Sequence, residues 1–294
     1  MNPRAGAAAS NPTETGGSTM RAQPASPPTN YQSVLDDITT RFAALLGTEG
    51  KVAHYIPALA RVPARQFGIA LRTREGVEAA VGDCDTPFSI QSISKLFSLT
   101  LALRRLDDAL CQRIGREPSG NLFDSLVQLE AEHGVPRNPF INAGAIAVAD
   151  RLLALGMGKH DVLALAGHLC GEAVAFDAEV AASEAATGFR NLALANFMKS
   201  FGKLDHAVAD VLGVYFHQCA IAMTCRQLAR AAAGEFAFCI GLPCKSGVGG
   251  GIVAVVPDTL TLCVWSPALD ATGNSAIGRR ALELFAARAG LSVF

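Results

Sequence analysis

The chain has 294 residues, half of them hydrophobic and only 17% charged, with a formal net charge of -1 at pH 7. That length and composition suit one large folded domain or two small ones rather than a disordered chain. Acidic and basic residues are interspersed, so no basic stripe indicates nucleic acid and no polybasic run indicates an anionic membrane. We therefore expect a small-molecule substrate, with no nucleic-acid partner and no membrane partner.

Residues 1–29 are rich in Ala, Ser, Thr, Pro, Gly and Asn, and they contain no apolar core of a secretion signal. We predict a disordered tail over residues 1–29 and a folded domain over residues 30–294. The longest apolar stretches are interrupted by charges, Gly or Pro before they reach membrane-spanning length. The expected location is therefore the cytoplasm.

The eight cysteines include no C-x-x-C pair, and the six histidines show no metal-binding spacing such as H-E-x-x-H. In a large apolar chain without a secretion signal, the thiols are expected to be reduced and mostly buried. Nothing in these patterns calls for a metal ion.

The first elements in chain order are a helix, a hairpin and a second helix. An amphipathic helix is predicted to open at Ser33, and strands are predicted over residues 67–73 and 77–81. The apolar residues of the run over 87–106 are too dense for a surface helix, so this run predicts a buried central helix.

The middle of the chain is predicted to be helical and its end to be rich in strands. Three helices that end near a glycine are predicted over residues 145–155, 161–169 and 191–201. Short strands are predicted over residues 236–240, 251–256 and 260–265, before a closing helix over 274–289. This order indicates an α+β fold, in which an antiparallel sheet is flanked by the terminal helices and a helical subdomain is inserted.

Ser92-Ile93-Ser94-Lys95 forms an S-x-x-K box within the predicted central helix. Residues three apart share one face of a helix, so the side chains of Ser92 and Lys95 can reach each other. A serine hydroxyl becomes a strong nucleophile when a base takes its proton, and a lysine that burial and nearby positive charge keep neutral can be that base. The same spacing also arises from a capping serine followed by a surface lysine, so the box alone leaves both interpretations open.

A K-S-G box at residues 245–247 precedes a glycine-rich segment and the strand predicted over 251–256. Serine hydrolases of the penicillin-binding class combine S-x-x-K on a helix with K-[ST]-G on a facing strand, in the same chain order. Backbone N–H groups of that strand and of Ser92 could form an oxyanion hole. A phosphate-binding loop is rejected, because Cys239 and Cys244 stand at the positions of its two glycines.

Longer segments around the two boxes resemble the serine-dependent glutaminase family. The matching segments are GKVAHYIP (50–57), PFSIQSISK (87–95), EPSG (117–120), NPFINAGAI (138–146), SE (183–184), RN (190–191), VLGVYFHQC (211–219), GLPCKSGVGGGI (241–252) and WSP (265–267). They cover the chain from roughly residue 31 to its end, so that residues 30–294 would be a glutaminase domain. The resemblance implies a β-lactamase-like or DD-peptidase-like fold, no metal or organic cofactor, and a homo-oligomer, with a homotetramer as the expected form.

The resemblance also implies a reaction and roles for particular residues. The reaction is hydrolysis of L-glutamine to L-glutamate and ammonia through a glutamyl ester. Ser92 would be the nucleophile, Lys95 its base, and Tyr55 a neighbour that assists proton transfer. The residues implied to bind glutamine are Ser92, Asn142, Glu184, Asn191, Tyr215 and, through its backbone at the oxyanion site, Val248. A carboxylate suits the α-ammonium of glutamine, and two amides suit its amino-acid end.

Each of these polar residues also has a purely structural interpretation. Asn142 and Asn191 could be helix N-caps. Glu184 could be a solvated helix residue, and Tyr55 and Tyr215 could pack at the edge of the core with their hydroxyls satisfied. Their joint occurrence inside the matched segments is what favours the functional interpretation.

The chain departs from the glutaminase pattern between residues 226 and 234. The family carries a longer stretch there, with a Met-Tyr-Asp segment shortly before the K-S-G strand, so its second active-site tyrosine has no counterpart here. Losing a proton-transfer group can cost about a hundredfold in rate. His54 also replaces the acidic residue usual before Tyr55.

Three interpretations stay open at this point. The first is a glutaminase, either fully active or impaired. The second is a non-catalytic relative that binds glutamine or only assembles with partners. The third is a β-lactam-binding serine hydrolase, which accounts for the two boxes but for none of the other matching segments.

Overall fold

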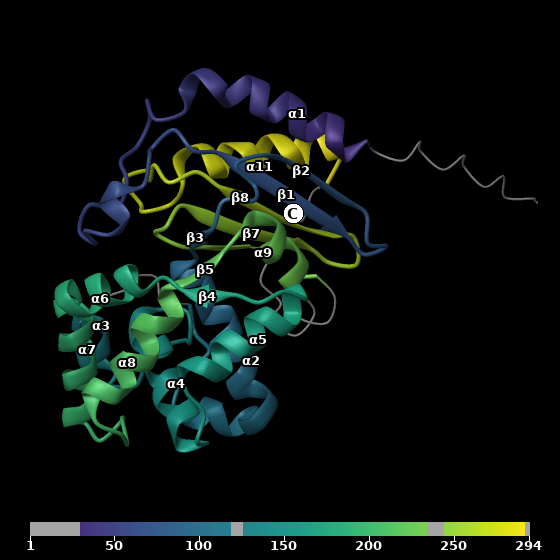
Figure 1. Ribbon diagram of the computed structural model, residues 1–294. Coiled ribbons are helices and arrows are strands. Elements are labelled where there is room, and N and C mark those ends of the chain that lie inside the picture. Colours follow the sequence, from purple (N-terminus) through teal and green to yellow (C-terminus); the bar gives the residue numbers. More distant parts are fainter. Residues whose placement is uncertain (1–29, 119–125, 234–243, 292–294) are drawn as a thin grey trace, which may run out of the picture.

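The computed structural model describes residues 30–118, 126–233 and 244–291. These residues form a sheet with two long helices on one side and a larger helical region on the other (Figure 1). The tail predicted over residues 1–29 and the strand predicted over 236–240 lie outside the described residues.

The main sheet has five antiparallel strands in the order β2-β1-β8-β7-β6. Their bounds are β1 (Gly68–Thr73), β2 (Glu78–Gly82), β6 (Cys244–Ser246), β7 (Gly251–Val256) and β8 (Leu260–Trp265). The prediction is confirmed for β7 and β8 to the residue, and for the β1–β2 hairpin within one residue. Because β1 pairs along its whole length with β8, the first strand of the chain lies beside the last.

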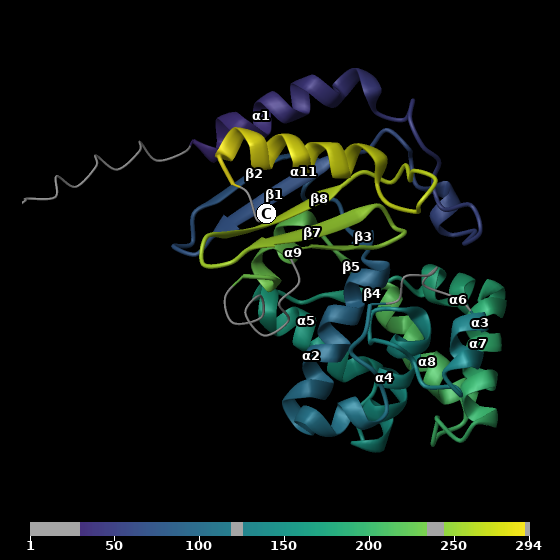
Figure 2. The same ribbon diagram turned by 180° about the vertical axis from the view of Figure 1, so that it is seen from behind.

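Two helices cover one face of this sheet, α1 (Tyr31–Phe42) and α11 (Ala276–Ala289), as Figures 1 and 2 show from opposite sides. Leu35 and Ile38 of α1 are fully buried, and they join a core with alternate residues of β8, Leu262 and Val264. Cys263, between them in the strand, faces the opposite core, because neighbouring side chains of a strand point to opposite faces. The terminal helices therefore flank the sheet as predicted.

The helical region is inserted between β2 and β6. Its helices are α2 (Ser94–Leu106), α3 (Leu126–Ala131), α4 (Asn142–Ala154), α5 (Lys159–Cys170), α6 (Ala178–Thr187), α7 (Phe189–Ser200), α8 (Val208–Cys219) and α9 (Cys225–Ala231). A small sheet in the order β3-β5-β4 joins it to the main sheet, with β3 (Phe88–Ser89), β4 (Ala175–Phe176) and β5 (Ile221–Met223). The helices predicted over 145–155, 161–169 and 191–201 correspond to α4, α5 and α7.

The prediction of one continuous helix over residues 87–106 was wrong at its start. Phe88 and Ser89 pair with β5, and a single turn of 3-10 helix over Gln91–Ile93 precedes α2. Gln91 has φ +50°, a left-handed value that a right-handed helix cannot continue through. The rest of the prediction is confirmed, since α2 buries eight of its thirteen residues at the centre of the helical region.

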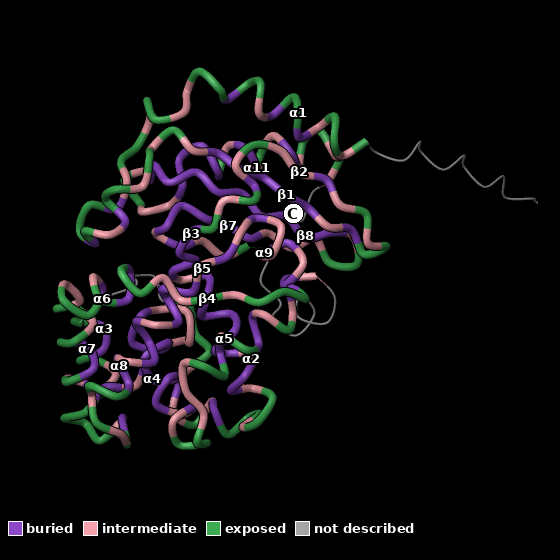
Figure 3. Tube along the Cα trace, viewed as in Figure 1, coloured by how far each residue is buried: buried purple, intermediate pink, exposed green. Residues whose placement is uncertain are grey.

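Buried residues of the sheet and of α2 and α4 form the interior of the molecule (Figure 3), whereas α5 buries one face, with Val162, Leu165, Ala166 and Cys170. Seven described cysteines are free of disulfides and five of them are buried, as expected. No helix in the described ranges is long and apolar enough to span a membrane.

Candidate active site

Ser92 lies in the turn that leads from β3 into α2. Ile90 donates its N–H to Ile221 O at 2.9 Å, and Ser89 Oγ donates to Cys219 O at 2.8 Å, so β5 and α8 hold the start of the turn. Gln91, directly before Ser92, is buried and donates from Nε2 to Ser89 Oγ at 2.9 Å. A non-glycine residue with left-handed φ stores about 1–3 kcal/mol of strain, which persists only where the surroundings hold it. Ser92 is therefore presented, half-buried, on a held and strained turn.

Lys95 is almost completely buried, with 2% of its surface exposed. Its Nζ donates to Phe140 O at 2.9 Å and to Asn142 Oδ1 at 2.8 Å, both of which are neutral acceptors. Burial, reinforced by the positive charge of Lys245, lowers the pKa of Lys95 to about 7. Near neutral pH a large fraction of Lys95 is uncharged and able to accept a proton, so the alternative of a surface lysine is wrong.

Asn142 and Asn191 are brought together and linked to Lys95. Asn142 is the first residue of α4, and its Nδ2 donates to Asn191 Oδ1 at 3.0 Å. The N-cap positions of α4 and α7 are held by Ile141 and Gly188 instead, so the alternative that these asparagines are N-caps is wrong. A hydrogen-bonded chain therefore runs from Lys95 through Asn142 to Asn191.

Glu184 of α6 lies in the same buried region, where it and Lys95 affect each other's pKa. It is buried, which excludes the alternative of a solvated helix residue, and burial raises its pKa to about 7. A hydrogen bond with Gln91 and the charge of Lys95 act against this rise. A buried carboxyl with no ion-pair partner among the described residues is a suitable acceptor for a cationic ligand group.

The two tyrosines differ in exposure. Tyr215 of α8 is buried, and burial raises its pKa well above the ordinary value, with further contributions from Cys219, Glu184 and Tyr55. Tyr55 is 54% exposed, although its neighbours Ala53 and Ile56 are buried in a small apolar cluster. Because Tyr55 is one of the groups that act on the pKa of Tyr215, it lies near the buried polar groups, at their solvent-facing edge.

The glycine-rich turn after β6 packs directly on the Ser92 turn. A Cβ on Gly247 would lie 2.5 Å from Ile90 O and 3.2 Å from Ser92 N, and one on Gly249 would lie 2.2 Å from Ser89 O. Only glycine allows this approach of two backbones. The predicted facing of the S-x-x-K turn and the K-S-G strand is confirmed.

Val248 stands between these two glycines, and its N–H donates to no carbonyl in the described part of the chain. Trp265 holds the turn in place, because its Nε1 donates to Gly249 O at 2.9 Å and its ring stacks on Phe88 at 4.9 Å between centroids. A free N–H beside the backbone of Ser92 is the arrangement that an oxyanion hole requires.

Two residues of this site were missed by sequence reasoning. Phe140 contributes only its backbone carbonyl, and Gln91 acts through its left-handed φ and its side-chain amide. Both lie inside segments that match the glutaminase family, but neither has a residue type that indicates chemistry. No three His, Cys, Asp or Glu residues among those described are placed to hold a metal ion.

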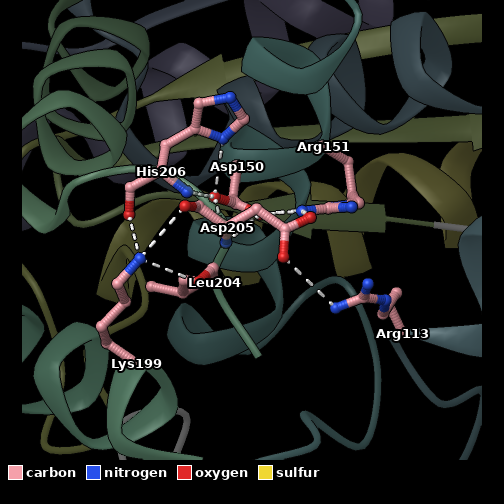
Figure 4. Close-up of polar contacts among 7 residues, drawn as sticks. All are labelled: Arg113, Asp150, Arg151, Lys199, Leu204, Asp205 and His206. Carbon is pink, nitrogen blue, oxygen red and sulfur yellow. Dashed lines mark hydrogen bonds and ion pairs between the residues drawn. The ribbon is translucent and has the colours of Figure 1, made fainter. Parts of the chain in front are cut away.

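A second buried polar cluster lies two turns further along α4, around Asp150 (Figure 4). The fully buried Asp150 carboxylate accepts the backbone N–H groups of Asp205 and His206, the ring Nδ1 of His206 at 3.0 Å, and the guanidinium of Arg151. Lys199 Nζ donates to the carbonyls of residues 204–206 at 2.9–3.1 Å. This cluster joins α4 to the segment between α7 and α8.

The sequence and the fold were compared with known proteins. A sequence model of the glutaminase family matches residues 50–233 and 231–294. A glutaminase of Rhizobium meliloti (strain 1021) is 50% identical over 91% of this chain and 98% of its own length, and a thermolabile glutaminase of Rhizobium etli is 49% identical over 90% and 99%.

Solved structures agree with these sequence matches. The probable glutaminase ybaS superposes with a TM-score of 0.79 at 32% identity, over 90% of this chain and 98% of that one. A probable glutaminase of Bacillus subtilis gives 0.74 at 28% identity, over 90% and 96%.

One stretch of the relatives is missing from this chain. The alignment with the Rhizobium meliloti protein runs over 309 positions, whereas 91% of this chain is only about 268 residues, so about 40 positions have no counterpart. The two pieces of the family match meet at residues 231–233, directly after α9, where the sequence departs from the family pattern. Although it lacks these positions, the chain belongs to the glutaminase family of amidohydrolases and has the β-lactamase-like α+β fold of that family.

Proposed function

We propose that this chain hydrolyses L-glutamine to L-glutamate and ammonia, with Ser92 as the nucleophile and Lys95 as its base. The observation that carries the proposal is the environment of Lys95. It is buried, held by two neutral oxygens, and it lies at the start of α2, three residues after Ser92 of the preceding 3-10 turn. A lysine in that setting can take a hydroxyl proton near neutral pH.

In the proposed first step, Ser92 Oγ attacks the side-chain amide carbon of glutamine while its proton passes to Lys95 Nζ. The amide oxygen takes the negative charge, and the N–H groups of Ser92 and Val248 stabilise it. Lys95 then returns the proton to the amide nitrogen, the C–N bond breaks, and ammonia leaves. Water attacks the resulting glutamyl ester with Lys95 as base again, which releases glutamate and restores Ser92.

The remaining site residues are proposed to bind the amino-acid end of the substrate. Glu184 pairs with the α-ammonium, which gives the buried carboxyl a direct ion-pair partner that none of the described residues supplies. Asn142 and Asn191 hydrogen-bond the α-carboxylate end, and Tyr215 closes the buried wall. Tyr55, at the exposed edge, assists proton transfer. The reaction uses no metal or organic cofactor.

We further propose that the protein acts in the cytoplasm as a homo-oligomer, with the homotetramer as the expected form. The support in the chain itself is an apolar strip on α7. Phe189 is 73% exposed and Leu192 is 44% exposed, and residues three apart share one face of a helix. A second copy of the chain would cover this strip.

The test is ammonia release from L-glutamine by the purified protein, with L-asparagine as the alternative substrate. In Ser92→Ala we expect turnover to fall by at least about a thousandfold, with the Kd for glutamine by calorimetry within about threefold of wild type. Ser98→Ala, at a buried serine of α2 six residues after Ser92, serves as the matched control and should keep its activity. Equal loss of binding and turnover in Ser92→Ala would mean that the nucleophile is misassigned.

A second candidate function is favoured by the missing positions after α9. If the family's second tyrosine is indispensable, this chain is a relative that binds glutamine without hydrolysing it. Binding of glutamine by a folded wild-type protein, with no ammonia above that of Ser92→Ala, would establish this second function instead of the first.

A further inference from the structure

We infer that Lys245 is a positioning residue for the reaction proposed above, because its strand packs on the Ser92 turn and brings a positive charge that disfavours a second one on Lys95. The inference rests on the proposed function, in which Lys95 must be neutral to act as a base. Lys245 would act through Lys95 and would not contact the reacting atoms itself.

The place of Lys245 in the fold brings it to the nucleophile. It is the middle residue of β6, paired with Val253 of β7, and its side chain is half-buried. Two residues further on, Gly247 comes so close to the Ser92 turn that a Cβ there would lie 3.2 Å from Ser92 N. The strand that carries Lys245 is therefore held against the start of α2.

One cavity also links Lys245 to the segment that holds Lys95. Lys245 lines a cavity of about 650 Å³ together with Phe140 and with Leu99 and Leu103 of α2. The carbonyl of Phe140 accepts a hydrogen bond from Lys95 Nζ. The other charged groups on the wall of this cavity are Arg116 and Glu117.

Neither lysine forms an ion pair with a carboxylate of the described residues. Lys95 donates to two neutral oxygens, and Lys245 Nζ donates to Ser246 O at 2.7 Å. Two ammonium groups in one poorly solvated site repel each other, so the more buried one is the first to lose its proton.

The other groups that face Lys95 do not reverse this result. They are Glu184 from α6 and Cys219 from α8, and their attraction is weaker than the effect of burial and of Lys245. Burial also raises the pKa of Glu184 to about 7 and that of Cys219 to about 12, so Cys219 carries no charge near neutral pH. The pKa values follow the same order, about 7 for Lys95 and about 8 for Lys245.

The experiment compares Lys245→Met with Lys245→Arg, which keeps the positive charge. Without the charge, the pKa of Lys95 rises, so the acidic limb of the kcat/KM profile should move up by about one pH unit. The rate should fall about fivefold at pH 7 and return to the wild-type rate above pH 9. Lys245→Arg should keep the wild-type profile. A loss in Lys245→Met that is the same at every pH would overturn the inference, since it would indicate a structural role.

A measurement that does not need activity separates this inference from the proposed function. The chain has only six lysines, so the titration of Lys95 can be followed by NMR of protein labelled at the lysine ε-carbon and assigned with Lys95→Arg. The midpoint for Lys95 should be higher in Lys245→Met than in wild type. An unchanged midpoint rejects the role of Lys245 even in an active enzyme. Conversely, a shifted midpoint in a protein that releases no ammonia upholds the electrostatic effect and rejects the proposed function.

Discussion

Glu184 and Lys95 are buried groups of opposite charge whose pKa values are both about 7. Because each affects the other, they titrate as a pair around neutrality. The pKa of Glu184 is raised above its unfolded value, so its contribution to stability is complete below about pH 4.5 and is lost as the pH rises towards 7. At neutral pH the buried Glu184 carboxyl therefore lowers the stability of the folded protein, as is common for groups that bind a ligand.

At the residue scale, this predicts how substrate binding depends on pH. The KM for L-glutamine should rise below pH 7 as Glu184 takes up a proton and can no longer pair with the α-ammonium. In Glu184→Gln the KM should be about 10- to 100-fold higher at pH 8, as expected for loss of a charge-assisted hydrogen bond, and nearly independent of pH. Steady-state kinetics from pH 5.5 to 8.5 would measure both effects.

The matched control is Glu179→Gln on the same helix, where the carboxylate is exposed and pairs with Arg61. It should leave the KM and its pH profile unchanged. If Glu184→Gln kept the wild-type KM, Glu184 would have no role in binding glutamine.

The residues of the site were predictable to different degrees. Ser92 and Lys95 follow from a box with a known chemical logic, and the asparagines follow from a resemblance that spans long segments. The contributions of Gln91 and Phe140 could not be predicted, because a left-handed φ and a backbone carbonyl are consequences of the folded chain. The polarity of a residue indicates candidates for a site, while its φ and its backbone partners depend on tertiary contacts.

At the scale of elements, α4 contributes residues to two separate polar clusters. Asn142 at its start accepts the hydrogen bond from Lys95, and Asp150, two turns later, collects the donors of the segment between α7 and α8 (Figure 4). The second contact fixes how far α4 can slide or rotate. The geometry around Lys95 therefore depends on a carboxylate that takes no part in the proposed chemistry.

Asp150→Asn should accordingly destabilise the protein. An amide presents an NH2 group where the carboxylate accepts several donors, and it removes the buried one of the two carboxylates that pair with Arg151, the other being Asp205. We expect a loss of about 2–4 kcal/mol in the free energy of unfolding, measured with urea. Asp108→Asn, in an exposed pair with Arg116, should change it by less than about 0.5 kcal/mol. A value for Asp150→Asn as small as that of the control would contradict the anchoring role.

Element boundaries were predicted best where local chemistry sets them. Glycine and proline delimit β7 and β8, and Gly290 ends α11 in a left-handed conformation. By contrast, α8 is rich in β-branched and aromatic residues that favour strands, and burial among α4, α6 and α7 overrides that preference. The break at Gln91 is likewise a product of the contacts with β5.

At the scale of the whole molecule, the apolar strip on α7 predicts self-association. Phe189→Glu should reduce the mass of the particle measured by light scattering after gel filtration, because burying the new charge in an interface is unfavourable. Val77→Glu, at an apolar position beside β2 that is 57% exposed, is the matched control and should leave the mass unchanged. A wild-type mass equal to that of one chain, or an unaltered mass in Phe189→Glu, would contradict assembly through α7.

The pairing of β1 with β8 has a consequence for how the protein is made. The residues of β1 leave the ribosome early, but their partners from Thr261 to Trp265 are synthesised only near the end of translation. Until then, one edge of the β1–β2 hairpin exposes unpaired N–H and C=O groups, a template for pairing with other chains. The sheet can close only after nearly the whole polypeptide has emerged, so the nascent chain should depend on chaperones that shield this edge.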